Sequence, residues 1–185
     1  MFRVISAVGL AAAVAGVLVH RLAVRGPSPS AEAPDGRGRL VKLLARLGWL
    51  SAAASAAVLA GTGFWEVLVR NESLRGYLLM VHVSGGGVFA AALAVVVVLE
   101  AGRHRFEPGD GQRGRRLHGG RKFCFWAVAV LSIPAILSLV LSMLRLFGST
   151  AQQYLLETHR YSTLGLTMAG VWLAYLTARS RGGAA

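Results

Sequence analysis

The sequence predicts an all-α integral membrane protein with five spans, a four-helix bundle preceded by one extra helix. Three observations predict this fold class. The chain of 185 residues is 55% hydrophobic, with a mean hydropathy of +0.55, which is more apolar than an ordinary soluble domain. Its apolar residues form runs long enough to cross a bilayer. Its basic residues, which give a net charge of +12, fall between those runs, so they indicate cytoplasmic loops rather than a nucleic-acid surface.

The first apolar run, Val4–Val19, predicts a short transmembrane helix within residues 1–20. With Arg3 before it, the run also resembles a signal peptide, but no clean small-x-small cleavage site precedes the basic segment. We therefore expect the helix to be retained. Residues 21–42 are rich in proline, glycine and basic side chains, and predict a cytoplasmic linker.

Residues 43–178 predict the four-helix membrane domain, with many small residues in its first helix that would allow close packing in lipid. The predicted spans are Leu43–Trp65, Tyr77–Leu99, Phe123–Phe147 and Leu155–Thr177. The predicted loops are Glu66–Arg75, Glu100–Lys122 and Gly148–Tyr154, followed by a cytoplasmic tail at 179–185. Pro134 should kink the fourth span.

The distribution of basic residues predicts the orientation. The segments Arg21–Arg46, Glu100–Lys122 and the tail, which follow the first, third and fifth spans, carry 6, 7 and 2 basic residues, whereas the other two loops carry only Arg70 and Arg75. Positive segments face the cytoplasm. The amino terminus is then outside and the carboxyl terminus in the cytoplasm, in a bacterial inner membrane.

Two histidines, His82 and His159, lie near the starts of the third and fifth spans, both of which begin on the outer side. At 1.5 Å rise per residue, each is roughly 6–9 Å below the outer interface. Histidines inside membrane helices are rare and usually functional. Two at equal depth on parallel helices can face one another across a bundle and ligate one haem iron from both sides.

The residues around the two histidines fit a haem b. Gly85 and Gly86, just after His82, remove side chains where a flat macrocycle would lie, and Arg75 and Arg160 are placed to meet its propionates. The alternative is a pair of packing histidines bonded to nearby hydroxyls or carbonyls. Zinc is disfavoured because no third or fourth ligand lies at that depth. Cys124, the single cysteine, excludes an internal disulfide and is expected to be a small buried hydrophobe.

Several motifs between Leu40 and Arg179 give the sequence a family resemblance. These are GTGF, GYLLMVH, AGRHRF, RKFCFW and ETHRYSTL followed by WLAY. In these the chain resembles the four-helix cytochrome b subunits of respiratory formate dehydrogenase, nickel–iron hydrogenase and thiosulfate reductase. The resemblance implies a haem-binding bundle in which His82 and His159 stand at the places of the outer-haem ligands.

The resemblance also implies a second, inner haem, but both of its ligands are missing. The first place reads Arg46-Leu47-Gly48-Trp49, and the second is Leu173. We therefore expect one haem, on the outer side, and electron transfer between a membrane quinone and a periplasmic partner, either an iron–sulfur subunit or a multihaem cytochrome. Aromatic and acidic residues near that face are candidates for a quinone pocket. They are Glu66, Trp65, Tyr77, Tyr154 and Glu157.

Three hypotheses compete for this chain. The first is an electron-transfer subunit that anchors a larger redox complex in the lipid, rather than an enzyme by itself. The second is a non-redox structural subunit on a degenerate cytochrome scaffold. The third, a transporter, is disfavoured because mid-span polarity is limited to small hydroxyls. His20, His104 and His118 are expected at the cytoplasmic interface, and a second haem between His20 and His104 remains an alternative.

Overall fold

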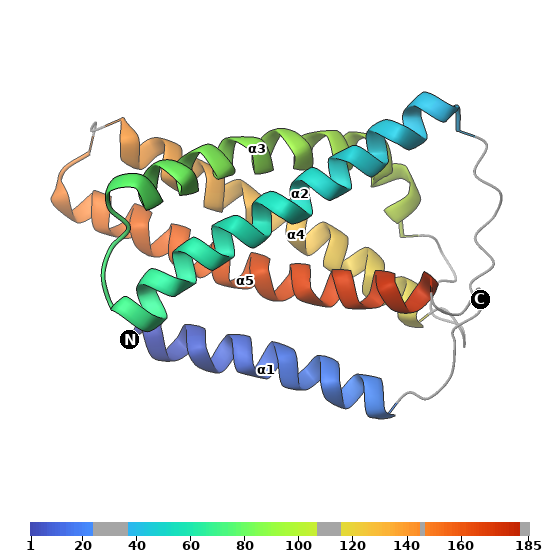
Figure 1. Ribbon diagram of the computed structural model, residues 1–185, viewed down its shortest axis with the longest axis horizontal. Coiled ribbons are helices and arrows are strands. Elements are labelled where there is room, and N and C mark those ends of the chain that lie inside the picture. Colours follow the sequence, from blue (N-terminus) through green and yellow to red (C-terminus); the bar gives the residue numbers. More distant parts are fainter. Residues whose placement is uncertain (24–36, 107–115, 145–146, 182–185) are drawn as a thin grey trace.

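The computed structural model describes residues 1–23, 37–106, 116–144 and 147–181, which are helical almost throughout (Figure 1). Within that part of the chain there is no strand, and the predicted all-α class is confirmed. The helices are α1 (Phe2–Ala23), α2 (Arg39–Trp65), α3 (Gly76–Glu100), α4 (Arg116–Met143) and α5 (Ser149–Arg181).

Helices α2 with α3 and α4 with α5 form two antiparallel hairpins, and the most extensive contacts lie within these hairpins. Helix α1 packs along α5 (Figure 1). The amino-terminal ends of α1, α3 and α5 lie at one end of the bundle. We call it the histidine end, because it carries His82 and His159, and we call the opposite end the core end. The three predicted basic segments follow helices that finish at the core end.

Within the described residues, four helical segments are long and apolar enough to cross a membrane. They are Phe2–Ala23, Arg39–Arg70, Gly76–His104 and Gly119–Met143. The predicted fifth span, Leu155–Thr177, lies inside α5, but α5 is not among them. Its early turns carry Glu157, His159 and Arg160. A helix packed between α1 and α4 exposes less surface to lipid, so it requires fewer apolar residues.

The predicted loops are shorter in the structure, because the helices continue beyond their apolar runs. Glu66–Arg70, predicted as loop, is a π-helical turn that prolongs α2, and Asn71 ends it with a left-handed φ of 55°. Ala101–His104 is a 3₁₀ turn that prolongs α3. Helices α4 and α5 begin at Arg116 and Ser149, earlier than their apolar residues predict.

Three further helix boundaries differ from the prediction. Helix α4 ends at Met143 rather than Phe147, and the ends of α1 and α2, at Ala23 and Arg39, shorten the predicted 21–42 linker. Most of that linker, much of the predicted Glu100–Lys122 loop and the end of the tail lie outside the described residues. Those segments are 24–36, 107–115 and 182–185.

Small side chains on α1 bring it close to α5. A Cβ added at Gly16 would lie 2.9 Å from the Trp172 ring, and one at Gly9 would lie 3.4 Å from the Met168 sulfur. Ser6 and Ala13, on the same stripe, are fully or almost fully buried. Such spacing of small residues is typical of helix pairs that approach closely in lipid.

The hydrophobic core lies toward the core end, where α3, α4 and α5 meet. Its buried members are Phe89, Leu93, Val96, Phe125, Val128 and Leu173, and Trp49 of α2 packs against them. Phe125 is only 2% exposed and Val96 is fully buried. This cluster joins the two hairpins and leaves the histidine end to be organised by other residues.

Candidate functional site

His82 lies in the second turn of α3 and faces α2. Its Nδ1 is 2.8 Å from the Thr62 hydroxyl oxygen. A Cβ added at Gly63 would lie 3.3 Å from the His82 Cε1 atom, so the absence of a side chain there lets the ring approach α2. The Nδ1–Cε1 edge of the ring therefore faces α2, and the ring is half-buried.

The direction of the Thr62 bond follows from counting protons. The Thr62 hydroxyl has one proton, and its oxygen is 2.8 Å from the Val58 carbonyl and 3.3 Å from that of Leu59. A carbonyl can only accept, so the hydroxyl donates to the helix backbone. The His82 Nδ1–H must then donate to Thr62. Neutral His82 consequently keeps its lone pair on Nε2.

His159 has the same tautomer for a simpler reason. Its Nδ1 is 2.9 Å from the carbonyl oxygen of Ala135 in α4. A carbonyl accepts, so Nδ1 carries the proton and donates it, leaving the Nε2 lone pair free. Among the described residues, Nε2 of neither ring makes a hydrogen bond.

The two rings face one another across the bundle. Their centres are 6.4 Å apart and their planes are inclined at 73°. The matched depth inferred from the sequence is therefore also a close contact in space. No group of three or more His, Cys, Asp or Glu side chains that could hold a metal occurs within the described residues.

The glycines after His82 differ in their surroundings. A Cβ at Gly85 would make an ordinary contact with Leu59, 3.6 Å away. One at Gly86 would have only Leu139 of α4 near it, at 4.0 Å, and one at Gly87 would meet nothing within 4 Å. Gly86, one turn after His82, therefore has only one distant side chain opposite it, whereas Gly87 is exposed.

The two arginines expected at haem propionates are engaged elsewhere in this structure. Arg75 is bonded to Glu72 at 2.8 Å in the loop before α3. The Arg75 guanidinium, with Arg70 adding to its effect, holds the pKa of Glu72 below its usual range. Arg160 lies over the ring of Phe2 at 5.8 Å, a cation–π contact that helps seat α1 on α5.

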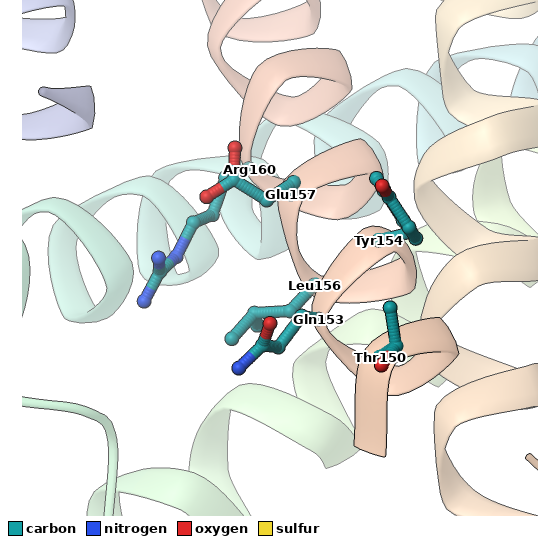
Figure 2. Close-up of a pocket in the computed structure, with 6 residues that line it drawn as sticks. All are labelled: Thr150, Gln153, Tyr154, Leu156, Glu157 and Arg160. Atoms are coloured by element: carbon teal, nitrogen blue, oxygen red, sulfur yellow. The ribbon is translucent and has the colours of Figure 1, made fainter. Parts of the chain in front are cut away.

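The predicted quinone residues fall into two groups. Glu66 is buried and bonded to Arg70 at 3.3 Å, while Trp65 and Tyr77 are exposed. Tyr154 and Glu157 instead line an open pocket of about 460 Å³ on the amino-terminal part of α5 (Figure 2). The other residues lining that pocket are Thr150, Gln153, Leu156 and Arg160.

The histidines near the core end have different environments from the pair. His104 is buried, lies flat on Phe125 with ring centres 4.0 Å apart and planes at 14°, and is bonded at Nδ1 to the Glu100 carbonyl. His20 of α1 is bonded at Nδ1 to the Tyr175 hydroxyl of α5 at 2.9 Å. The side chain of His118 lies outside the described residues.

Sequence reasoning missed the groups that hold the two rings. Thr62 and Gly63 lie in the GTGF motif, which was noted for its resemblance but not connected with His82. The sequence signal for such a contact is a hydroxyl and a glycine within two turns of the end of one helix, with a histidine near the start of the next. The Ala135 carbonyl gives no sequence signal, because every residue has a backbone carbonyl.

No protein-family model, no curated protein and no solved structure matches this chain. The functional conclusion therefore rests on the residues and their geometry.

Proposed function

We propose that this chain is a b-type cytochrome embedded in the membrane, the anchoring subunit of a respiratory redox complex, with one haem b between His82 and His159. One observation carries the proposal. Two imidazoles from different helices lie 6.4 Å apart between ring centres, each bonded at Nδ1 and free at Nε2. A hydrogen bond at the non-ligating nitrogen is the usual support of a metal-binding histidine.

The separation of the rings suits an iron ligated from both sides. An imidazole nitrogen bonds a transition metal at about 2.0–2.1 Å and lies about 1.1 Å from its ring centre, so two rings across one metal have centres roughly 6 Å apart. The described residues offer no third protein ligand. A group that brings its remaining ligands with it, as a porphyrin does, fits such a site.

A haem bound here would supply a one-electron carrier, and the chain supplies its binding and surroundings. His82 and His159 would ligate the iron, while Thr62 and the Ala135 carbonyl would hold the two rings in the ligating tautomer. Gly86, one turn after His82, would leave the α3 backbone without a side chain on the same face. The apolar helices around the site exclude water, which influences the reduction potential.

The packing of the core end supports a single haem. In the cytochrome b subunits that the sequence resembles, a second haem takes its ligands at places that read Arg46-Leu47-Gly48-Trp49 and Leu173 here. A Cβ at Gly48 would already lie 3.1 Å from Val96. Leu173 is 5% exposed and belongs to the same cluster as Phe125. Packed side chains occupy that region.

The proposal includes a quinone at the histidine end, in the pocket that Tyr154 and Glu157 line. Reduction of a quinone to a quinol takes two electrons and two protons, and oxidation releases them. The Glu157 carboxylate can accept or give one of these protons, and it lies two residues before His159. The basic segments follow helices that finish at the core end, so by the positive-inside rule the histidine end faces the periplasm. The electron partner at that end is an iron–sulfur or multihaem cytochrome subunit.

One observation favours a second candidate, a non-redox structural subunit. Both histidines already have a hydrogen-bond partner within the bundle, as packing histidines would. On that hypothesis the free Nε2 atoms bind nothing, and the rings serve only to join α3 with α2 and α5 with α4.

The two candidates are separated by optical spectra of the purified protein. We expect a b-type α-band in the reduced-minus-oxidised spectrum, abolished by His82→Ala or His159→Ala and unaffected by His20→Ala, which also removes a half-buried histidine. In His82→Gly, added imidazole should restore the band. Persistence of the band in either ligand variant would contradict the ligand assignment, and its absence from the wild-type protein would favour the structural subunit.

The quinone part has its own test. Glu157→Gln should slow oxidation of the reduced haem by a water-soluble quinone analogue about 10-fold or more, without moving the α-band. Glu72→Gln, which removes an exposed carboxylate from the same end, serves as the control. Equal rates in wild-type protein and Glu157→Gln would exclude this carboxylate from proton transfer.

A further inference from the structure

The planes of the two candidate ligand rings are held by two different helices. Thr62 of α2 accepts the His82 Nδ1–H at 2.8 Å, and the Ala135 carbonyl of α4 accepts the His159 Nδ1–H at 2.9 Å. An imidazole that ligates through Nε2 can still rotate about that bond, and a fixed acceptor at Nδ1 stops the rotation. The angle between the planes, 73°, is therefore set from outside the ligand pair.

The Thr62 hydroxyl is well suited to this task, because its own proton is occupied. It is bonded to the Val58 carbonyl at 2.8 Å within α2, which leaves its lone pair directed away from that carbonyl and available to the ring. Gly63 lets the ring reach it, since a Cβ there would lie 3.3 Å from Cε1. The two adjacent residues of the GTGF motif thus position one imidazole.

We propose that Thr62 is a positioning residue that holds the ring plane of His82 at a steep angle to that of His159. It thereby sets the anisotropy of the ferric haem signal and lowers the reduction potential of the bound haem. This inference rests on the proposed function. Two coplanar imidazoles interact with the same one of the two iron dπ orbitals and so separate the energies of these orbitals. Two steeply inclined imidazoles interact with both orbitals and leave them nearly equal in energy. The second case gives a strongly anisotropic low-spin ferric signal, with a larger highest g value.

The effect on the potential has a definite sign. Donation from Nδ1–H to an acceptor makes the imidazole more basic and a better electron donor to the metal. A better donor stabilises the ferric state and lowers the potential. Losing the acceptor should therefore raise the potential, by a three- to tenfold change in the reduction equilibrium, or about 30–60 mV for one electron.

The test uses the full-length protein with its haem and isosteric variants at Thr62. Thr62→Val removes the acceptor and should raise the midpoint potential and reduce the highest g value, while Thr62→Ser should retain both wild-type values. Thr167→Val is the matched control, because Thr167 is also bonded to a backbone carbonyl, that of Thr163 at 2.8 Å, and makes no hydrogen bond with either histidine. An unchanged potential and g value in Thr62→Val would overturn the proposal.

Two further outcomes keep the tests separate. If Thr62→Val does not assemble, Thr62→Cys decides, because sulfur is a weaker acceptor than oxygen. It should shift both quantities part of the way, and wild-type values there would contradict the role of Thr62. A wild-type protein without any haem would refute the proposed function itself, whereas a haem whose signal is of the coplanar type would refute only the positioning role.

Discussion

The two ends of the bundle use the same residue type in different ways. At the histidine end, His82 and His159 face one another with Nε2 free, and Gly63 lies beside the His82 ring. At the core end, His104 lies flat on Phe125 and is enclosed by packed side chains. The difference shows that a membrane histidine becomes a candidate ligand through a facing partner and open space, whereas a histidine stacked on an aromatic ring acts as part of the core.

The largest expected effect at the core end comes from Phe125→Ala. Removing a ring that is 2% exposed leaves a cavity against His104 and Leu173, and such truncations cost about 3–5 kcal/mol. Unfolding in detergent, followed by circular dichroism, should give the loss of stability. The haem α-band of the protein that remains folded should stay in place, because the histidine end does not depend on this ring. A loss of haem from folded Phe125→Ala would contradict the claim that haem binding at the histidine end is independent of packing at the core end.

Leu173→His would attempt to convert the core end into a second site. We expect a loss of stability of about 1–3 kcal/mol from burying an imidazole without a partner, and no second haem. The place expected to supply the second ligand, Arg46–Trp49, has no histidine, and Gly48 within it lies against Val96. Haem content by the pyridine haemochrome method should remain at the wild-type value, and a rise would show that the core end is open to a cofactor.

A smaller and more local effect is expected from Gly63→Ala. The added Cβ would lie 3.3 Å from the His82 Cε1, so the ring must shift by a few tenths of an ångström. We expect a several-fold loss of haem affinity, measured by haem transfer to an acceptor protein. Gly61→Ala is the matched control in the same motif, since nothing lies within 4 Å of its added Cβ. Equal affinities in the two variants would remove Gly63 from the site.

The smallest effect concerns the loop at the histidine end. Hydrogen bonding from Arg75 lowers the pKa of Glu72, so its contribution to stability is present above the ordinary carboxyl pKa and is lost as the pH falls through the lowered value. Glu72→Gln should therefore destabilise the protein slightly near neutral pH and not in acid. The measurement is the unfolding midpoint against pH. A larger effect in acid than at neutral pH would contradict the assigned pair.

Much of this organisation could be predicted from the sequence, because apolar runs determine membrane helices. The depth of His82 and His159 in their runs predicted that they would lie side by side. Helix ends could not be predicted as well, since Glu66–Arg70 carries a charged residue at each end yet continues α2 as a π-helical turn. The partners of the rings were also missed. Whether Thr62 faces His82 depends on the rotation of α2 about its axis, which the sequence does not determine. The Ala135 carbonyl is a backbone group, so residue type does not reveal that it is an acceptor.

The composition of α5 shows a second limit of sequence reasoning. Its apolar residues predict a span over Leu155–Thr177, but α5 as a whole is less apolar than the other helices and lies between α1 and α4. A helix with neighbours on two sides can carry the polar residues of a site. The helix that departs most from the apolar pattern is also the one that contributes His159 and the pocket of Tyr154 and Glu157.

The central claim is that one haem lies between His82 and His159 and none at the core end. The most direct measurement is the haem content per chain of the purified protein, by pyridine haemochrome against a chain concentration from amino-acid analysis. We predict one haem b per chain. No haem would contradict the site, and two haems per chain would contradict the difference between the two ends.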